Sequence, residues 1–132
     1  MVINVNRVLY KDKINQKLLI VDDEKGIQNL TKIVFNKFGY EVDTANNGLE
    51  GLNMYKKNEY CCVISDSTMP VMTGPEMYKR IKQHDPNANF IFITGDKNLL
   101  EKTIKNEYIK QKPFGINEFN EINYKIQERL YR

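Results

Sequence analysis

Residues 61–70 read CCVISDSTMP, an apolar run that ends at Asp66 and is followed by a polar turn sequence. A second apolar run, LLIV at residues 18–21, ends in the same way at Asp22 and Asp23. Short apolar runs bounded by polar residues are typical of buried strands. Because the carboxyl ends of parallel strands meet at one edge of a sheet, we expect the three carboxylates to lie close together.

Strand-like and helix-like segments alternate along the chain. Strands are predicted at residues 18–21, 40–45, 61–65, 89–94 and 108–111. Helices are predicted from apolar residues at helical spacing: Ile27, Leu30, Val34 and Phe38, with Gly39 as a cap; Leu49, Leu52 and Tyr55; Met77 and Ile81; Leu100 and Ile104; and Phe119, Ile122, Ile126 and Leu130. This alternation predicts an α/β fold, a doubly wound five-stranded parallel sheet with helices on both faces.

Composition excludes several classes of protein. The 132 residues suffice for one domain, and the lysines that give a net charge of +3 are spread out, which does not support nucleic-acid binding. No apolar stretch approaches the roughly 20 residues that span a membrane. Cys61 and Cys62 adjoin within a predicted strand and would point to opposite faces, which favours buried reduced thiols and a cytoplasmic location. Residues 1–16 precede the first predicted strand as an N-terminal extension, for which an ordered arm, a dimer contact and a disordered lead stay open; a tail without a chemical role is the favoured interpretation.

The residues at the predicted strand ends suit phosphoryl chemistry. Three carboxylates within a few ångströms repel one another unless a cation compensates, and an all-oxygen site favours Mg²⁺ or Mn²⁺. Thr94 and Lys112, at the ends of the fourth and fifth strands, add a hydroxyl and an ammonium group. With a metal and a cation beside it, the Asp66 carboxylate is a usable nucleophile toward phosphorus. The pattern therefore predicts an aspartyl phosphate at Asp66, with Thr94 and Lys112 bound to the phosphoryl oxygens.

Four segments, in this order, resemble the signature blocks of response-regulator receiver domains, in particular those of the chemotaxis type. They are LLIVDDE at 18–24, SDSTMPVMTG at 65–74, FITG at 92–95 and KPF at 112–114. The resemblance covers about residues 17–132, which we expect to form the receiver domain. It implies a flavodoxin-like strand order, 2-1-3-4-5.

The resemblance also implies a role for each site residue. Asp66 would be the phosphoacceptor, and Asp23, Asp66 and the Thr68 carbonyl would bind Mg²⁺, with Asp22 helping through water. Thr94 and Lys112 would sense the phosphoryl group, and the Lys112–Pro113 bond would be cis.

The resemblance predicts a signalling function. A sensor histidine kinase or a histidine phosphotransfer protein would donate the phosphoryl group, and phosphorylation would switch binding to an unknown effector. Such a domain is not an enzyme, although it assists its own phosphotransfer and dephosphorylation. The alternative is a pseudo-receiver, an interaction module that is never phosphorylated. An aspartyl-phosphate phosphatase would need a second acid at the position of Thr68, and the acids at 22–24 would repel the phosphate of a flavin.

Two departures from the family concern the switch region. Lys112 follows Thr94 by eighteen positions, about one helical turn fewer than the family usually has, so a short fourth helix is expected. The family also places an aromatic residue three positions before the lysine, where this chain has Ile109. In a regular strand Lys110 would fall where the family buries an apolar side chain. Either the strand is regular, or a one-residue bulge moves Tyr108 into the switch position.

Overall fold

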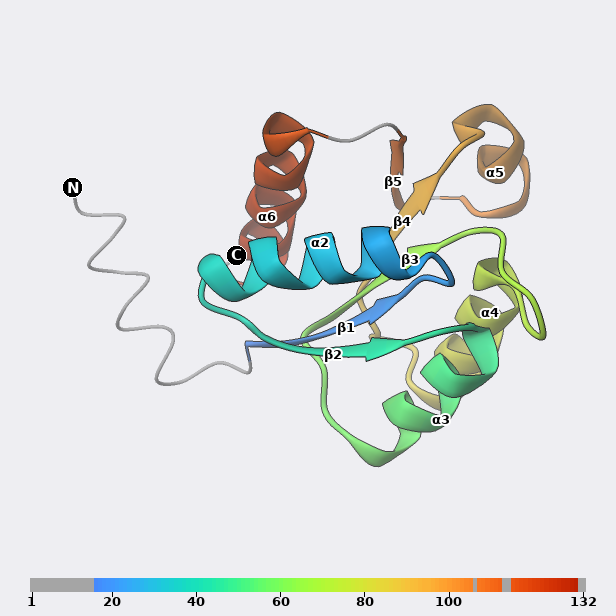
Figure 1. Ribbon diagram of the computed structural model, residues 1–132. Helices are drawn as coiled ribbons and strands as arrows, with labels where there is room; N and C mark the ends of the chain where they lie inside the picture. Colours follow the sequence, from blue (N-terminus) through green and yellow to red (C-terminus); the bar gives the residue numbers. More distant parts are fainter. Residues whose placement is uncertain (1–15, 106, 113–114, 131–132) are drawn as a thin grey trace.

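The computed structural model describes residues 16–105, 107–112 and 115–130. In this part of the chain, five parallel strands form one sheet in the order β2-β1-β3-β4-β5. The strands are β1 (Lys17–Val21), β2 (Glu41–Ala45), β3 (Cys62–Asp66), β4 (Phe90–Thr94) and β5 (Tyr108–Gln111). The helices are α2 (Lys25–Lys37), α3 (Gly48–Lys57), α4 (Gly74–His84), α5 (Lys97–Thr103) and α6 (Ile116–Leu130). The predicted α/β fold and its strand order are confirmed (Figure 1).

Two predictions concern residues that the structure does not describe. The N-terminal extension, apart from Gln16, lies outside the described residues, and so does Pro113 of the expected cis bond.

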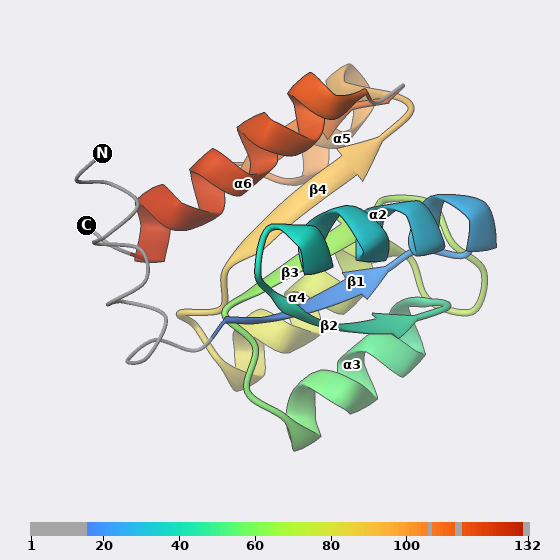
Figure 2. The ribbon, with the colours of Figure 1, turned by 60° about the vertical axis from the view of Figure 1, so that its left-hand side comes forward.

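The helices cover both faces of the sheet, with α2 and α6 on one face and α3 and α4 on the other (Figure 2). Side chains alternate along β1, so Leu18 and Ile20 pack into the core under α2 and α6. Leu19 and Val21 pack into the core under α3, α4 and α5. The strand β1 is thus buried on both faces, and the acids Asp22 and Asp23 follow it directly at the carboxyl edge of the sheet.

Polar groups set the ends of the helices. The Asn47 side chain accepts a hydrogen bond from the Glu50 N–H at the start of α3 (2.9 Å), and the Thr73 hydroxyl accepts one from the Glu76 N–H at the start of α4 (3.2 Å). Gly39 follows α2 with a φ of 104°, the left-handed conformation expected of a glycine that ends a helix. The predicted cap at Gly39 is therefore confirmed.

The buried face of α2 departs from the predicted one at Leu30, whereas Val34 and Phe38 pack against the core as expected. Leu30 is 47% exposed, whereas Gln28 and Thr31 are buried. The reason lies in the Gln28 amide, which donates to the carbonyl oxygens of Asp22 (2.9 Å) and Ala45 (3.0 Å). This polar contact turns Gln28 toward the ends of β1 and β2 and leaves Leu30 facing outward.

The last strand is regular. Ile109 pairs with Phe92 and Lys110 pairs with Ile93 without a bulge, so the structure has the regular strand of the two alternatives, with Ile109 three positions before Lys112. Ile109 is buried in the core cluster on the α5 side of the sheet, and Tyr108 packs on the α6 side. Lys110 avoids the expected burial because its long side chain carries the ammonium group to Glu121 of α6, at 2.8 Å.

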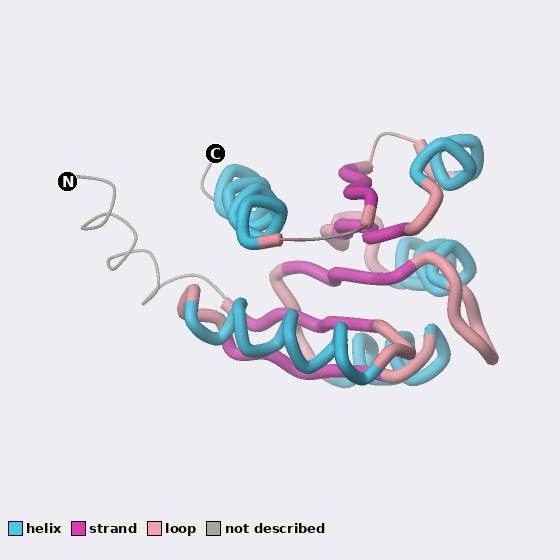
Figure 3. Tube along the Cα trace, turned by 45° about the horizontal axis from the view of Figure 1, so that its top comes forward, coloured by secondary structure: helices cyan, strands magenta, loops and turns pink. Residues whose placement is uncertain are grey.

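The expected short fourth helix is confirmed as α5, which has seven residues. It lies on the opposite side of β5 from α6 (Figure 1 and Figure 3). Leu100 is its only buried residue, and the Asp96 side chain caps it by accepting the N–H of Leu99 at 3.0 Å. Together with Ile104, which directly follows the helix and is also buried, Leu100 gives α5 fewer core anchors than any other helix of the described chain.

Both cysteines are buried and free. Contrary to the expected alternation, they pack into the same core cluster, since Cys61 lies in the bend that precedes β3 and only Cys62 belongs to the strand. Among the described residues, no helix is long and apolar enough to cross a membrane.

Candidate phosphoacceptor and metal site

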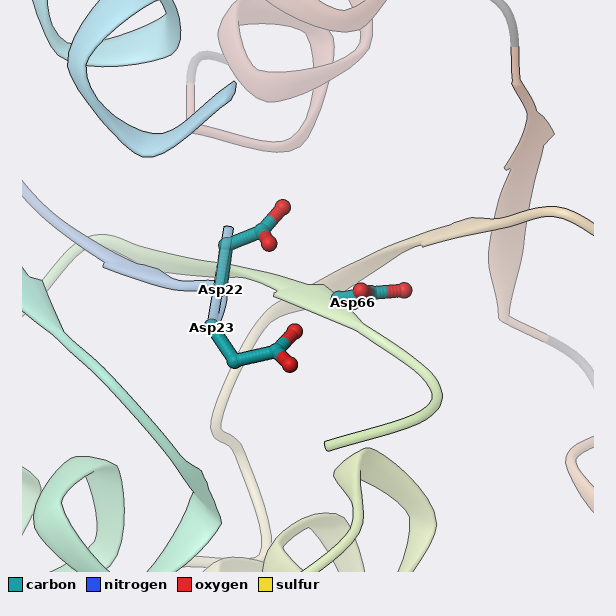
Figure 4. Close-up of side chains that lie close together, drawn as sticks. All are labelled: Asp22, Asp23 and Asp66. Atoms are coloured by element: carbon teal, nitrogen blue, oxygen red, sulfur yellow. The ribbon is translucent and has the colours of Figure 1, made fainter. Parts of the chain in front are cut away.

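Three carboxylates meet at the carboxyl edge of the sheet (Figure 4). Asp22 and Asp23 follow β1, and Asp66 is the last residue of the neighbouring strand β3. Each side chain offers one carboxylate oxygen, and these oxygens all lie within 4.8 Å of one another. The pairing of Val21 with Ser65 brings the three residues together, because it aligns the ends of the two strands.

Two acids of the site are buried, and their pKa values are raised. Asp22 is 2% exposed, and its burial raises its pKa from 3.8 to about 6 although the Glu24 N–H donates to its Oδ1 at 2.9 Å. The charge of Asp66 raises the pKa of Asp22 further. Burial also raises the pKa of Asp66, against the opposing effects of Lys112 and of the Ser67 N–H, which donates at 2.7 Å. An added cation would relieve both acids.

The donor atoms fit magnesium. All three residues supply hard carboxylate oxygens, which Mg²⁺ prefers, and none supplies the nitrogen or sulfur that zinc favours. Carboxylate oxygens within 4.8 Å of one another are close enough to share one ion, either directly or through a bound water. Thr68 is exposed in the loop after β3, and its role as a carbonyl ligand stays a prediction.

Lys112 reaches the same edge from β5. Its backbone N–H donates to the Thr94 carbonyl at 2.8 Å, which extends the pairing of β4 and β5. Its Nζ lies 3.4 Å from Asp66 Oδ2 and 3.3 Å from Glu24 Oε1. Burial lowers the pKa of Lys112, but the charges of Asp66, Asp22 and Glu24 outweigh it and raise the pKa overall. The sequence reasoning missed Glu24, whose one signal was its position directly after the acid pair.

Thr94 ends β4 beside the site and is 3% exposed. Its hydroxyl lies 2.8 Å from the Ser67 hydroxyl and accepts the N–H of Asp96 at 3.1 Å. Ser67 directly follows Asp66, so this contact spans β3 and β4 next to the phosphoacceptor candidate. Sequence reasoning missed Ser67, because the contact depends on the pairing of Asp66 with Ile93, which only the folded sheet defines.

The loop after β3 turns sharply back onto the strand end. The Gly74 N–H donates to the Ser67 carbonyl at 3.1 Å, and a Cβ atom on Gly74 would lie 2.3 Å from the Asp66 carbonyl oxygen. Glycine is therefore required by this close approach of two backbone segments. Met69 and Met72 of the loop are buried, which fixes the loop against the core.

Comparison with known proteins agrees with this fold and site. The family model of the response regulator receiver domain matches residues 18–122. The chain belongs to this family, the phosphoaspartate modules of two-component signalling.

Individual relatives match more than four fifths of this chain. Sporulation initiation phosphotransferase F of Bacillus subtilis is 37% identical over 111 residues, which are 81% of this chain and 90% of that protein. The response regulator TrrA of Thermotoga maritima, solved in complex with Mg²⁺ and BeF, is 31% identical with a TM-score of 0.74, over 84% of this chain and 98% of that one. The chemotaxis response regulator CheY4 of Vibrio cholerae is 27% identical with a TM-score of 0.77, over 86% and 99%.

Proposed function

We propose that Asp66 accepts a phosphoryl group from a phosphohistidine and that this phosphorylation changes the surface that an effector protein binds. The donor would be a sensor histidine kinase or a histidine phosphotransfer protein. The observation that carries the proposal is the position of the Asp66 carboxylate, within 4.8 Å of two other acids on one side and 3.4 Å from the Lys112 ammonium on the other. A carboxylate between a metal site and a cation is suited to attack phosphorus.

The transfer is a displacement at phosphorus. An Asp66 carboxylate oxygen forms the new O–P bond while the P–N bond to the donor imidazole breaks, and the imidazole nitrogen keeps the electron pair. Lys112 places its ammonium beside the phosphoryl oxygens, and the Thr94 hydroxyl donates to one of them. Asp23, Asp66 and the Thr68 carbonyl would hold Mg²⁺, with Asp22 acting through water, and the ion would neutralise charge on the phosphoryl oxygens when it is bound.

The proposal includes the setting of the domain. The chain assists transfer to and from its own aspartate and does not turn over an outside substrate as an enzyme does. The two free, buried thiols suit a reducing compartment, so we place the protein in the cytoplasm.

Intact mass after incubation with acetyl phosphate and Mg²⁺ tests the proposal. The wild-type chain should gain one phosphoryl group, and Asp66→Asn should gain none. Asp85→Asn is the matched control, because Asp85 follows α4 at the opposite edge of the sheet, and it should label as the wild type does. Labelling that survives in Asp66→Asn, or that needs no divalent ion, would contradict the assignment. An unlabelled wild-type chain would favour the pseudo-receiver alternative.

A further inference from the structure

The Thr94 hydroxyl has a defined set of partners in the resting domain. Its oxygen accepts the Asp96 N–H at 3.1 Å, and it lies 2.8 Å from the Ser67 hydroxyl. A hydroxyl has one hydrogen to donate and two positions at which it accepts. The Asp96 N–H uses one accepting position, so the direction of the contact with Ser67 decides whether the single Thr94 hydrogen is already used.

Burial indicates that direction. Thr94 is 3% exposed, and a buried hydroxyl hydrogen needs an acceptor from the protein. Ser67 Oγ supplies that acceptor at 2.8 Å. Ser67 and Thr94 both line a surface pocket between the β3–α4 loop and α5, but Ser67 is only half-buried, so water reaches the Ser67 hydroxyl more readily and can accept its hydrogen. Either hydroxyl can donate at this distance, and the difference in exposure favours Thr94 as the donor and Ser67 as the acceptor.

We propose that Ser67 is a positioning residue that opposes the phosphorylated state by holding the Thr94 hydroxyl. This inference rests on the proposed function, in which Thr94 donates its hydrogen to a phosphoryl oxygen on Asp66. Because Thr94 has one hydrogen, it must leave Ser67 before it can make that bond. Ser67 thus sets how strongly the phosphoryl group must attract Thr94 before the domain switches.

The same hydroxyl is connected to the start of α5. Asp96 donates its backbone N–H to Thr94 Oγ1. The side chain of the same residue caps α5 by accepting the N–H of Leu99. When the hydroxyl turns from Ser67 toward the phosphoryl group, the Asp96 N–H loses or lengthens its bond to Thr94. Release of Ser67 should therefore be visible in the amide signals of Gly95 and Asp96.

Titration of the whole chain with beryllofluoride in saturating Mg²⁺, followed by the amide signals of Gly95 and Asp96, tests the proposal. Beryllofluoride mimics the phosphoryl group and binds without a covalent step. Ser67→Ala removes the competing acceptor and should bind beryllofluoride roughly fivefold more tightly, the size expected for one neutral hydrogen bond. Ser67→Thr restores a hydroxyl and should return the affinity toward that of the wild type.

Two controls separate positioning from a general effect on the loop. In a Thr94→Ala background, Ser67→Ala should no longer change the affinity, because the hydroxyl that Ser67 holds is gone. Ser65 directly precedes Asp66, and its hydroxyl donates to the Asp66 carbonyl at 2.7 Å. Ser65→Ala removes this hydroxyl and should leave the affinity for beryllofluoride unchanged.

The outcomes distinguish this inference from the proposed function. An unchanged or weaker affinity of Ser67→Ala, or an equal gain in the Thr94→Ala background, would overturn the role of Ser67 while wild-type binding upholds the phosphoryl site. A wild-type chain that does not respond to beryllofluoride and Mg²⁺ would overturn both.

Discussion

Asp22 makes the metal-free domain less stable at neutral pH than at mildly acidic pH. Its carboxylate is 2% exposed, and burial raises its pKa from 3.8 to about 6. Asp22→Asn removes the charge with little change of shape, and the asparagine oxygen can still accept the Glu24 N–H that Asp22 accepts at 2.9 Å. The substitution therefore isolates the effect of burying this charge.

The sign follows from the direction of the pKa change. A group whose pKa is higher in the folded than in the unfolded protein binds its proton more tightly when folded, so its stabilising effect is complete below pH 3.8 and is lost as the pH rises through about 6. At about 1.4 kcal/mol per pH unit, the rise from 3.8 to about 6 amounts to about 3 kcal/mol. Asp22→Asn should therefore have little effect near pH 4 and should stabilise the metal-free protein by up to about 3 kcal/mol near pH 7.5.

Thermal and urea unfolding with a chelator, across this pH range, measures the effect. For a domain of this size, about 3 kcal/mol corresponds to a rise in melting temperature of about 10 °C. Asp23→Asn is the matched control, because Asp23 belongs to the same cluster but is exposed, and it should gain less. A gain for Asp22→Asn that is equal at both pH values, or a loss of stability near neutral pH, would refute this account of the site.

Three further predictions concern the metal, the loop and α5. Mg²⁺ should raise the melting temperature of the wild type by mass action, and Asp23→Ala should abolish this rise. Lys112→Met removes a competing cation and should make the rise larger at a given Mg²⁺ concentration. In urea unfolding, Gly74→Ala should lose about 2 kcal/mol or more, because its Cβ would meet a backbone oxygen at 2.3 Å, whereas Gly26→Ala, with nothing within 4 Å, should gain up to about 1 kcal/mol. Amide exchange should be fastest at about residues 96–107 and should slow when beryllofluoride binds; uniformly slow exchange there would contradict a weakly anchored α5.

The carboxyl edge of the sheet was predictable because the signals are local. Asp22 directly follows an apolar run, Asp66 follows another with only Ser65 between, and parallel pairing then brings the strand ends together. The length of α5 was predictable for a similar reason, since the short connection from Thr94 to Lys112 leaves room for little more than two turns. These conclusions need chain connectivity and strand burial, and they do not depend on how any helix is rotated.

Contacts that depend on the docking of whole elements were not predictable. The Lys110–Glu121 pair requires the position of α6 over β5, and the Ser67–Thr94 contact requires the register of β3 against β4. The outward turn of Leu30 depends on the Gln28 amide, which finds two carbonyl acceptors only after β1 and β2 have paired. In each case a polar side chain finds its partner through tertiary structure, which hydrophobic periodicity does not encode.

The small energies available at Thr94 indicate where the conformational change occurs. Exchanging one or two hydrogen bonds at Thr94 changes the free energy by about 1–3 kcal/mol, and a ligand shifts an equilibrium only by its difference in affinity for the two states. The helix α6 buries Phe119, Ile122 and Ile126, and moving it would disrupt far more than this. Only Leu100 of α5 is buried, and its capping residue Asp96 bonds directly to Thr94. Since Ile109 has no polar group to carry the signal along β5, we expect phosphorylation to act on the start of α5 and to leave α4 and α6 in place.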